Sequence, residues 1–117
     1  MSIRQADEID YIAWDDDATV SLMVSDHMDW EDSDEHIRLL EAKVGGYLAY
    51  ITTGRLAEEH PDARGRAVWI RVWGNSLPSY AGELWHKKAG RRCRKNGVQY
   101  EFRHRPLKVV DGQWRLG

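Results

Sequence analysis

The sequence predicts a single α+β domain over residues 1–117, built as two layers: a sheet of about four strands, with two helices on one of its faces. Strand-like and helical segments follow one another in the order β-β-α-β-α-β, which places the helices as crossovers between strands. The chain of 117 residues has the length of one ordinary domain. Its composition, 42% apolar and 31% charged residues, is typical of a folded globular protein.

The first two strands are expected at residues 9–14 and 19–24, joined as a hairpin. Apolar side chains alternate partially in the first segment and more clearly in the second. Three aspartates at 15–17 separate the segments, and aspartate favours turns because its side chain bonds nearby backbone amides.

The clearest element is an amphipathic helix that begins at Asp32 or Ser33. Either residue can cap the helix, and Glu35 can reach back to the first amides. The acidic first turn also complements the helix macrodipole. Apolar residues at three- and four-residue spacing form one stripe that should face the sheet: Ile37, Leu40, Val44, Tyr47, Leu48 and Ile51. Gly54 is expected to end the helix as a C-cap.

Two further strands are expected in the second half of the chain. A connector over residues 56–61, which contains Pro61, leads to a strand at 66–73, and a last strand follows at 98–104. Both strands alternate apolar and polar side chains, so each should turn one face towards the core. Residues 105–117 are expected to form a tail or a small terminal hairpin around the Asp-Gly pair at 111–112.

A second helix is expected between these strands, from Ser79 to about Lys95. Tyr80, Leu84 and Trp85 are its predicted apolar contacts with the rest of the domain.

Charge is divided unevenly along the chain. Residues 1–62 contain 16 Asp and Glu against 4 Lys and Arg, a net charge of −12. Residues 63–117 contain 3 acidic and 13 basic residues, a net charge of +10, which restores the total of −2. Such a division indicates either internal charge complementarity or two surfaces for different partners.

Other features limit the environment and the chemistry. The single cysteine, Cys93, excludes an internal disulfide and favours a reducing, cytoplasmic compartment. Its basic neighbours should favour the thiolate, but no Cys-His-acid arrangement accompanies it. The chain has neither a signal-peptide pattern nor an apolar stretch of membrane-spanning length. We therefore expect no membrane association.

An acidic motif at residues 24–32 runs into the first helix. Its dense carboxylates, next to a tryptophan, would suit a basic protein partner, because electrostatic complementarity speeds association and tryptophan often anchors interfaces. The predicted contact residues of this acidic face are Asp26, Asp29, Trp30, Glu31, Asp32 and Asp34.

Two other functions remain open. A nucleic-acid-binding module would use the basic run that Trp85 and His86 flank: Lys87, Lys88, Arg91, Arg92, Arg94 and Lys95. A small metal-dependent hydrolase would use Asp26, His27 and Asp29 as acid–base groups. Neither calcium-loop nor zinc-site spacing is present, so we expect no metal, no cofactor and no enzymatic activity.

The string Val-Ser-Asp-His-Met-Asp-Trp-Glu at residues 24–31 stands ahead of the amphipathic helix. This motif, with helix residues up to 51, resembles a family of small uncharacterised bacterial proteins that carry the pattern VSDHxDWE. No activity, cofactor or catalytic residue is established for that family, so the resemblance implies no function. Small stand-alone bacterial domains of this kind are often immunity or antitoxin proteins, which is an analogy of class. The leading hypothesis is therefore an immunity-type protein that binds and neutralises a toxin with a basic surface.

Overall fold

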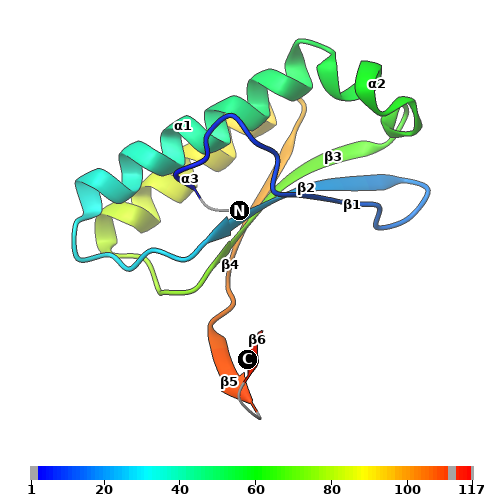
Figure 1. Cartoon of the computed structure of the whole chain (residues 1–117). Coiled ribbons are helices and arrows are strands. Elements are labelled where there is room, and N and C mark those ends of the chain that lie inside the picture. The colour runs from blue at the N-terminus through cyan, green and yellow to red at the C-terminus, as the bar shows by residue number, and fades with distance from the viewer. Residues whose placement is uncertain (1–2, 111–112, 117) are drawn as a thin grey trace.

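The computed structural model describes residues 3–110 and 113–116, with side chains for residues 3–106 (Figure 1). One sheet contains four strands in the order β1-β2-β3-β4. Its first pair is antiparallel, whereas β2, β3 and β4 run parallel to one another. The elements of this body are β1 (Tyr11–Ala13), β2 (Thr19–Asp26), α1 (Ser33–Thr52), α2 (Arg55–Glu59), the 3-10 helix η1 (Pro61–Ala63), β3 (Ala67–Gly74), α3 (Tyr80–Lys95) and β4 (Gln99–His104).

The two long helices, α1 and α3, lie side by side on one face of the sheet (Figure 1). The predicted α+β fold, with four strands and both long helices on one face, is confirmed. No helix in the described part of the chain is long and apolar enough to cross a membrane.

The segment after α1 was predicted as a connector without an element of its own, and it contains two short helices. Gly54 follows the last turn of α1 with a φ of 88°, a left-handed conformation that glycine adopts at little cost. The chain then enters α2 and η1 instead of an open loop. Leu56 and Ala63 are buried against the core, so these short helices cover its end. A five-residue helix is too short for its periodicity to stand out in the sequence.

The core lies between the sheet and the two helices. Its largest contribution comes from alternate residues of the two central strands and from one face of α1, all nearly inaccessible to solvent: Val20, Leu22, Val24, Ile70, Val72, Leu40, Val44 and Tyr47. Burying each such side chain stabilises the fold by roughly 1.5–3 kcal/mol. Two members of the predicted stripe, Ile37 and Ile51, are only half-buried, and Leu39 is buried in addition.

A lysine lies within the apolar stripe of α1. The side chain of Lys43 is fully buried, and its Nζ lies 2.7 Å from Oδ1 of Asp10. The same ammonium donates to the carbonyl oxygens of Gln5 and Glu8, each at 2.6 Å. All three ammonium hydrogens thus have acceptors, which a buried charge requires. Lys43 therefore fastens the N-terminal segment to α1.

The opposite face of the sheet has no helix on it in the described part of the chain (Figure 1). As the alternation predicts, β3 turns Val68, Ile70 and Val72 towards the helices and its intervening residues towards this open face. Beyond β4, Leu107–Val110 (β5) and Gln113–Leu116 (β6) pair antiparallel as a separate sheet. The Asp-Gly turn predicted between them falls on residues 111–112, outside the described residues.

Candidate functional site

The acidic motif occupies the loop between β2 and α1, at the carboxyl end of β2. We call residues 27–34 the acidic loop, which comprises the six residues of this connection and the first two residues of α1. Its carboxylates are Asp29, Glu31, Asp32 and Asp34, and all four residues are exposed. Two of the four also shape the backbone. Asp32 caps α1 by accepting the amide of Glu35 at 3.1 Å, and Asp29 accepts the amide of Glu31 at 3.0 Å.

A buried carboxylate–imidazole pair lies under this loop. The side chain of Asp26 is 2% exposed, and its Oδ2 lies 2.5 Å from Nε2 of His36, which is fully buried. Because the carbonyl of Asp29 can only accept, Nδ1 of His36 donates to it at 2.8 Å. The proton on that side fixes the ring orientation, so Nε2 faces the carboxylate of Asp26. Asp26 also accepts the amide of Met28 at 3.1 Å, so the loop entrance is fixed as well.

Trp30 joins the acidic loop to α3. Its indole stacks on the ring of His36 with centroids 3.7 Å apart. The indole also packs against Gly82 of α3, where an added Cβ would lie only 2.6 Å from it, so the packing requires glycine. At the N-termini of the two helices, the hydroxyls of Ser33 and Ser79 lie 2.8 Å apart. The first turns of α1 and α3 are thereby fixed to each other.

A second histidine completes this cluster from α3. His86 is buried, stacks on Phe102 with centroids 4.3 Å apart, and meets Trp30 edge to face. Its Nδ1 lies 2.6 Å from the hydroxyl of Tyr100. Its Nε2 has no hydrogen-bond partner among the described residues. Burial lowers the pKa of His86 to about 4, so the ring is neutral at neutral pH.

The structure divides the predicted contact residues into two groups. Asp26 is buried against His36, and the half-buried Trp30 stacks inward, so both serve as supports of the loop. The remaining four, the carboxylates of the acidic loop, face solvent. A periodic sequence pattern distinguishes inward from outward residues in a helix, but no such pattern exists in a six-residue loop.

Three exposed apolar residues beside the acidic loop were not predicted. Leu77 is 68% exposed, Tyr80 76% and Leu84 39%, and they lie around the first turn of α3, which the two serines hold next to α1. The predicted inward packing of Tyr80 and Leu84 is therefore wrong. The inward face of α3 consists of smaller residues at helical spacing, which leave room for Trp30 and the rings of β4: Gly82, His86, Ala89, Gly90 and Cys93.

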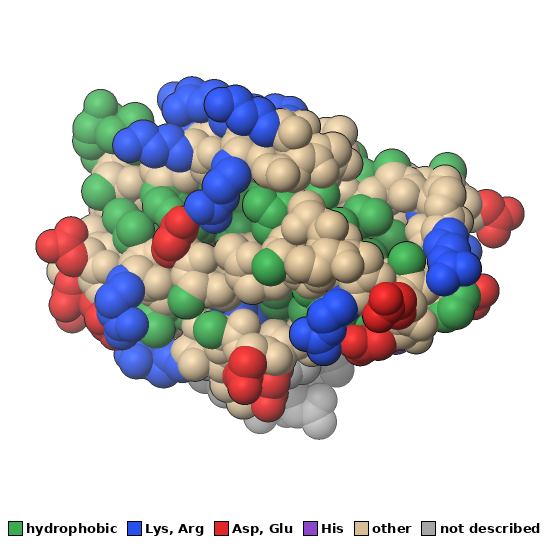
Figure 2. Space-filling model, turned by 90° about the horizontal axis from the view of Figure 1, so that it is seen from above, with side chains coloured by type: hydrophobic (Ala, Val, Ile, Leu, Met, Phe, Trp, Pro, Cys, Tyr) green, Lys and Arg blue, Asp and Glu red, His purple; other side chains and the backbone are tan. Residues whose placement is uncertain are grey.

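The basic run lies on the outer face of α3 (Figure 2). Five of its six predicted residues are exposed and form what we call the basic stripe: Lys87, Lys88, Arg91, Arg94 and Lys95. The sixth, Arg92, is half-buried and lies 2.5 Å from Oε1 of Glu41 on α1. Within the described residues, this is the one ion pair that joins the acidic and the basic half of the chain. Most charged side chains of the acidic loop and of the basic stripe are therefore exposed to solvent.

The residues of the hydrolase alternative do not converge. Asp26 pairs with His36, whereas His27 is exposed on the loop. Among the described residues, no group of three His, Cys, Asp or Glu side chains could hold a metal ion. Cys93 is buried, and burial raises its pKa despite the nearby Arg92 and Arg94, contrary to the expectation of a favoured thiolate.

The chain belongs to DUF6572, a family of unknown function, whose model matches residues 1–106. The match extends from the N-terminus through β4 and so covers the whole four-stranded body. This confirms the predicted membership of an uncharacterised family. No curated protein and no solved structure matches the chain.

Proposed function

We propose that this protein is a protein-interaction domain of the bacterial immunity type, which binds and neutralises a cognate toxin. The observation that carries the proposal is one end of the molecule, where the four carboxylates of the acidic loop lie beside exposed Leu77, Tyr80 and Leu84. We call this combined surface the acidic end (Figure 2). The partner would be a toxin or effector domain with a basic surface.

The charge of the acidic end supports this partner chemistry. In the described part of the chain, no lysine or arginine forms an ion pair with Asp29, Glu31, Asp32 or Asp34. The nearby Glu35, by contrast, pairs with Arg38 at 2.6 Å. A cluster of carboxylates that lack basic partners attracts a basic protein and raises its association rate.

The apolar residues and the rigidity of the acidic end support binding as well. Tyrosine is among the residues most enriched at interface hot spots, and Tyr80 presents its ring to solvent. The buried Asp26–His36 pair and the stacked Trp30 fix the loop before any partner arrives. A fixed loop loses little conformational entropy on binding, so more of the contact energy remains as affinity.

The test uses the product of the neighbouring reading frame as the first candidate partner, both in co-expression and as purified protein. Co-expression should protect growth, and calorimetry should measure a complex that weakens with salt. A variant with Asp29→Asn, Glu31→Gln, Asp32→Asn and Asp34→Asn should bind at least about tenfold more weakly. Asparagine caps helices as well as aspartate does, so the fold should be unaffected.

The matched control replaces an equal number of charges on α3: Lys87→Gln, Lys88→Gln, Arg91→Gln and Arg94→Gln. These four substitutions should leave the affinity unchanged. If the acidic-loop variant kept the affinity and salt dependence of the original protein, the proposed interface would be wrong.

The basic stripe supports a second candidate function, nucleic-acid binding. Its five exposed cations follow one helix face, an arrangement that suits phosphate contacts. However, Trp85 is half-buried and donates its Nε1–H to Glu41 at 3.0 Å, and His86 is buried. The stripe thus offers charge without free rings for base stacking. A mobility-shift assay with single-stranded RNA and duplex DNA at increasing salt tests this function: no shift at low salt would contradict it.

A further inference from the structure

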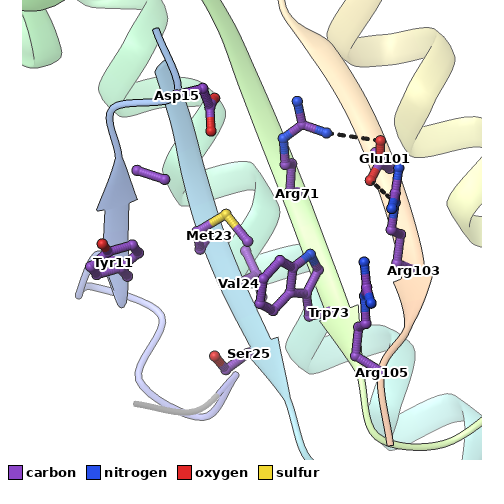
Figure 3. Close-up of a pocket in the computed structure, with 11 residues that line it drawn as sticks. Tyr11, Asp15, Met23, Val24, Ser25, Arg71, Trp73, Glu101, Arg103 and Arg105 are labelled. Carbon is purple, nitrogen blue, oxygen red and sulfur yellow. Dashed lines mark hydrogen bonds and ion pairs between the residues drawn. The ribbon is translucent and has the colours of Figure 1, made fainter. Parts of the chain in front are cut away.

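The open face of the sheet, opposite the helices, contains a hollow of about 470 Å³ (Figure 3). Its apolar part is formed by Tyr11, Ala13, Met23 and Trp73 from the first three strands. Three arginines line one side: Arg71 of β3, Arg103 of β4 and Arg105, which follows β4. Interface anchors dock in hollows of this kind, where an apolar surface lies beside a few charged groups.

Two of the three arginines are occupied by contacts within the sheet. Arg71 lies 2.8 Å from Oε2 of Glu101 and donates its Nε–H to Ser21 at 2.8 Å. Its guanidinium also stacks over Trp69, 4.1 Å from the ring centroid. Arg103 pairs with the same carboxylate, Glu101. One glutamate therefore serves two arginines, and the local charge stays positive.

The third arginine, Arg105, has no carboxylate partner among the described residues. Its guanidinium lies over Trp73, 5.5 Å from the ring centroid, and its buried Nε lacks a hydrogen-bond partner in the described part of the chain. The other acidic residue of the hollow, Asp15, accepts the hydroxyl of Ser21 at 2.6 Å and lies at the opposite end from Arg105 (Figure 3). An arginine held against an indole keeps its N–H edge oriented for a carboxylate.

We infer that this open face docks a protein segment that carries a carboxylate next to a large apolar side chain. The apolar side chain fills the hollow over Met23 and Trp73, and the carboxylate pairs with Arg105. The inference rests on the proposed protein-binding function. It adds a second binding surface, which is positively charged, whereas the acidic end is negatively charged.

The observations favour a protein segment over a nucleic acid. Trp69 and Trp73 already have a guanidinium over the ring, so neither indole offers that face to a base. The run of exposed cations that phosphates would require lies on α3, on the other side of the sheet. The hollow itself is lined mainly by apolar atoms, which favours an apolar side chain.

The test is an NMR titration of the ¹⁵N-labelled full chain with blocked peptides. The probe Gly-Asp-Phe-Asp-Gly should shift the indole N–H of Trp73 and the Nε–H of Arg105 in a saturable way. Gly-Asn-Phe-Asn-Gly, which lacks the charges, and Gly-Asp-Ala-Asp-Gly, which lacks the anchor, should each bind about tenfold more weakly. A single-stranded oligouridylate should leave both signals unchanged.

Variants of the protein locate the contact. Arg105→Gln should weaken the charged peptide about tenfold, Arg105→Lys should weaken it less, and the matched surface change Arg91→Gln should have no effect. The inference is overturned if neither signal moves, if the neutral or the alanine peptide binds equally well, or if the oligouridylate moves the same signals.

Failure here is distinguishable from failure of the proposed function. The acidic-loop substitutions should leave peptide binding unchanged, because the loop lies at the carboxyl end of β2 and does not line the hollow. A partner that needs the acidic loop but not Arg105, together with a silent peptide titration, would overturn the open-face inference alone.

Discussion

The acidic loop and the basic stripe of α3 carry opposite charges, and they differ in how the fold supports them. The stripe needs nothing beneath it except a regular helix, because its cations recur at the spacing of one helix face. The acidic loop has no repeating backbone structure and depends on the Asp26–His36 pair, on Trp30 and on the serine contact between the helices. A surface that the core supports in this way keeps one shape, which is what selective recognition of a partner requires.

The acidic loop and the basic stripe also account for the division of charge along the chain. Within the described residues, Glu41 and Arg92 form the one ion pair between the two halves. The sequence offered two explanations for the division of charge. Internal charge complementarity, the first of them, therefore accounts for little of that division. The other explanation, two surfaces available to different partners, fits the exposed positions of both sets of charges.

The largest effect is expected from removing the support of the acidic loop. His36→Ala leaves Asp26 as a buried carboxylate without its partner, and loss of one member of a buried pair typically costs about 3–5 kcal/mol. Urea unfolding should show this loss in the free energy of unfolding. The exposed neighbour variant His27→Ala should change stability by no more than about 0.5 kcal/mol. Equal effects of the two substitutions would show that the loop does not depend on the buried pair.

The next effect is a pH dependence that originates beneath the basic stripe. Burial lowers the pKa of His86 from 6.5 to about 4, so between these values the unfolded chain binds a proton that the folded chain excludes. This contribution to stability is complete above pH 6.5 and falls as the pH falls, by about 3 kcal/mol once the pH is below 4.

The measurement compares urea unfolding of the protein and of His86→Gln between pH 7 and pH 4. The other titrating groups are common to both proteins, so the difference between the two curves isolates His86. The variant should lose less stability over this range. Parallel curves would contradict a buried neutral histidine at this position.

Much of the fold could be predicted because its elements are periodic. The alternation in β2, β3 and β4 and the spacing in α1 identify these elements and their inward faces. The candidate site was less accessible to prediction. The carboxylates of Asp26 and Asp29 look alike in the sequence, yet one is buried and the other exposed. Their directions depend on His36, which follows ten residues after Asp26 and only the fold brings back to it.

Lysines and tyrosines show the same limit. Lys43 interrupts the apolar stripe of α1, and only contacts with the distant segment around Asp10 explain its burial. Tyr80 lies where an apolar contact is expected, but the inward face of α3 is already filled by Trp30 against Gly82. A ring that the core does not need remains available for a partner.

A smaller effect is expected from removing that ring. Tyr80→Ala should weaken binding to the partner by roughly 2 kcal/mol, about thirtyfold, if the ring is a hot spot of the acidic end. Its stability should change by no more than about 0.5 kcal/mol, because the side chain is 76% exposed. Calorimetric titration and urea unfolding provide the two values. The matched change Trp14→Ala, which lies between β1 and β2, is 43% exposed and does not line the hollow, tests whether the loss is specific to the acidic end.

The smallest effect is expected from neutralising the basic stripe. Replacing all five residues by glutamine removes the favourable interaction of Arg94 and Lys95 with the C-terminal end of α3, at a cost of about 0.3–1 kcal/mol each. Because these side chains are exposed and the inward face of α3 is not changed, the fold should otherwise be the same, and so should the affinity for a partner of the acidic end. Urea unfolding measures the stability of this variant, and calorimetry measures its affinity for the partner. A large loss of affinity would reverse the comparison, since the stripe, and not the supported loop, would then be the surface that recognises the partner.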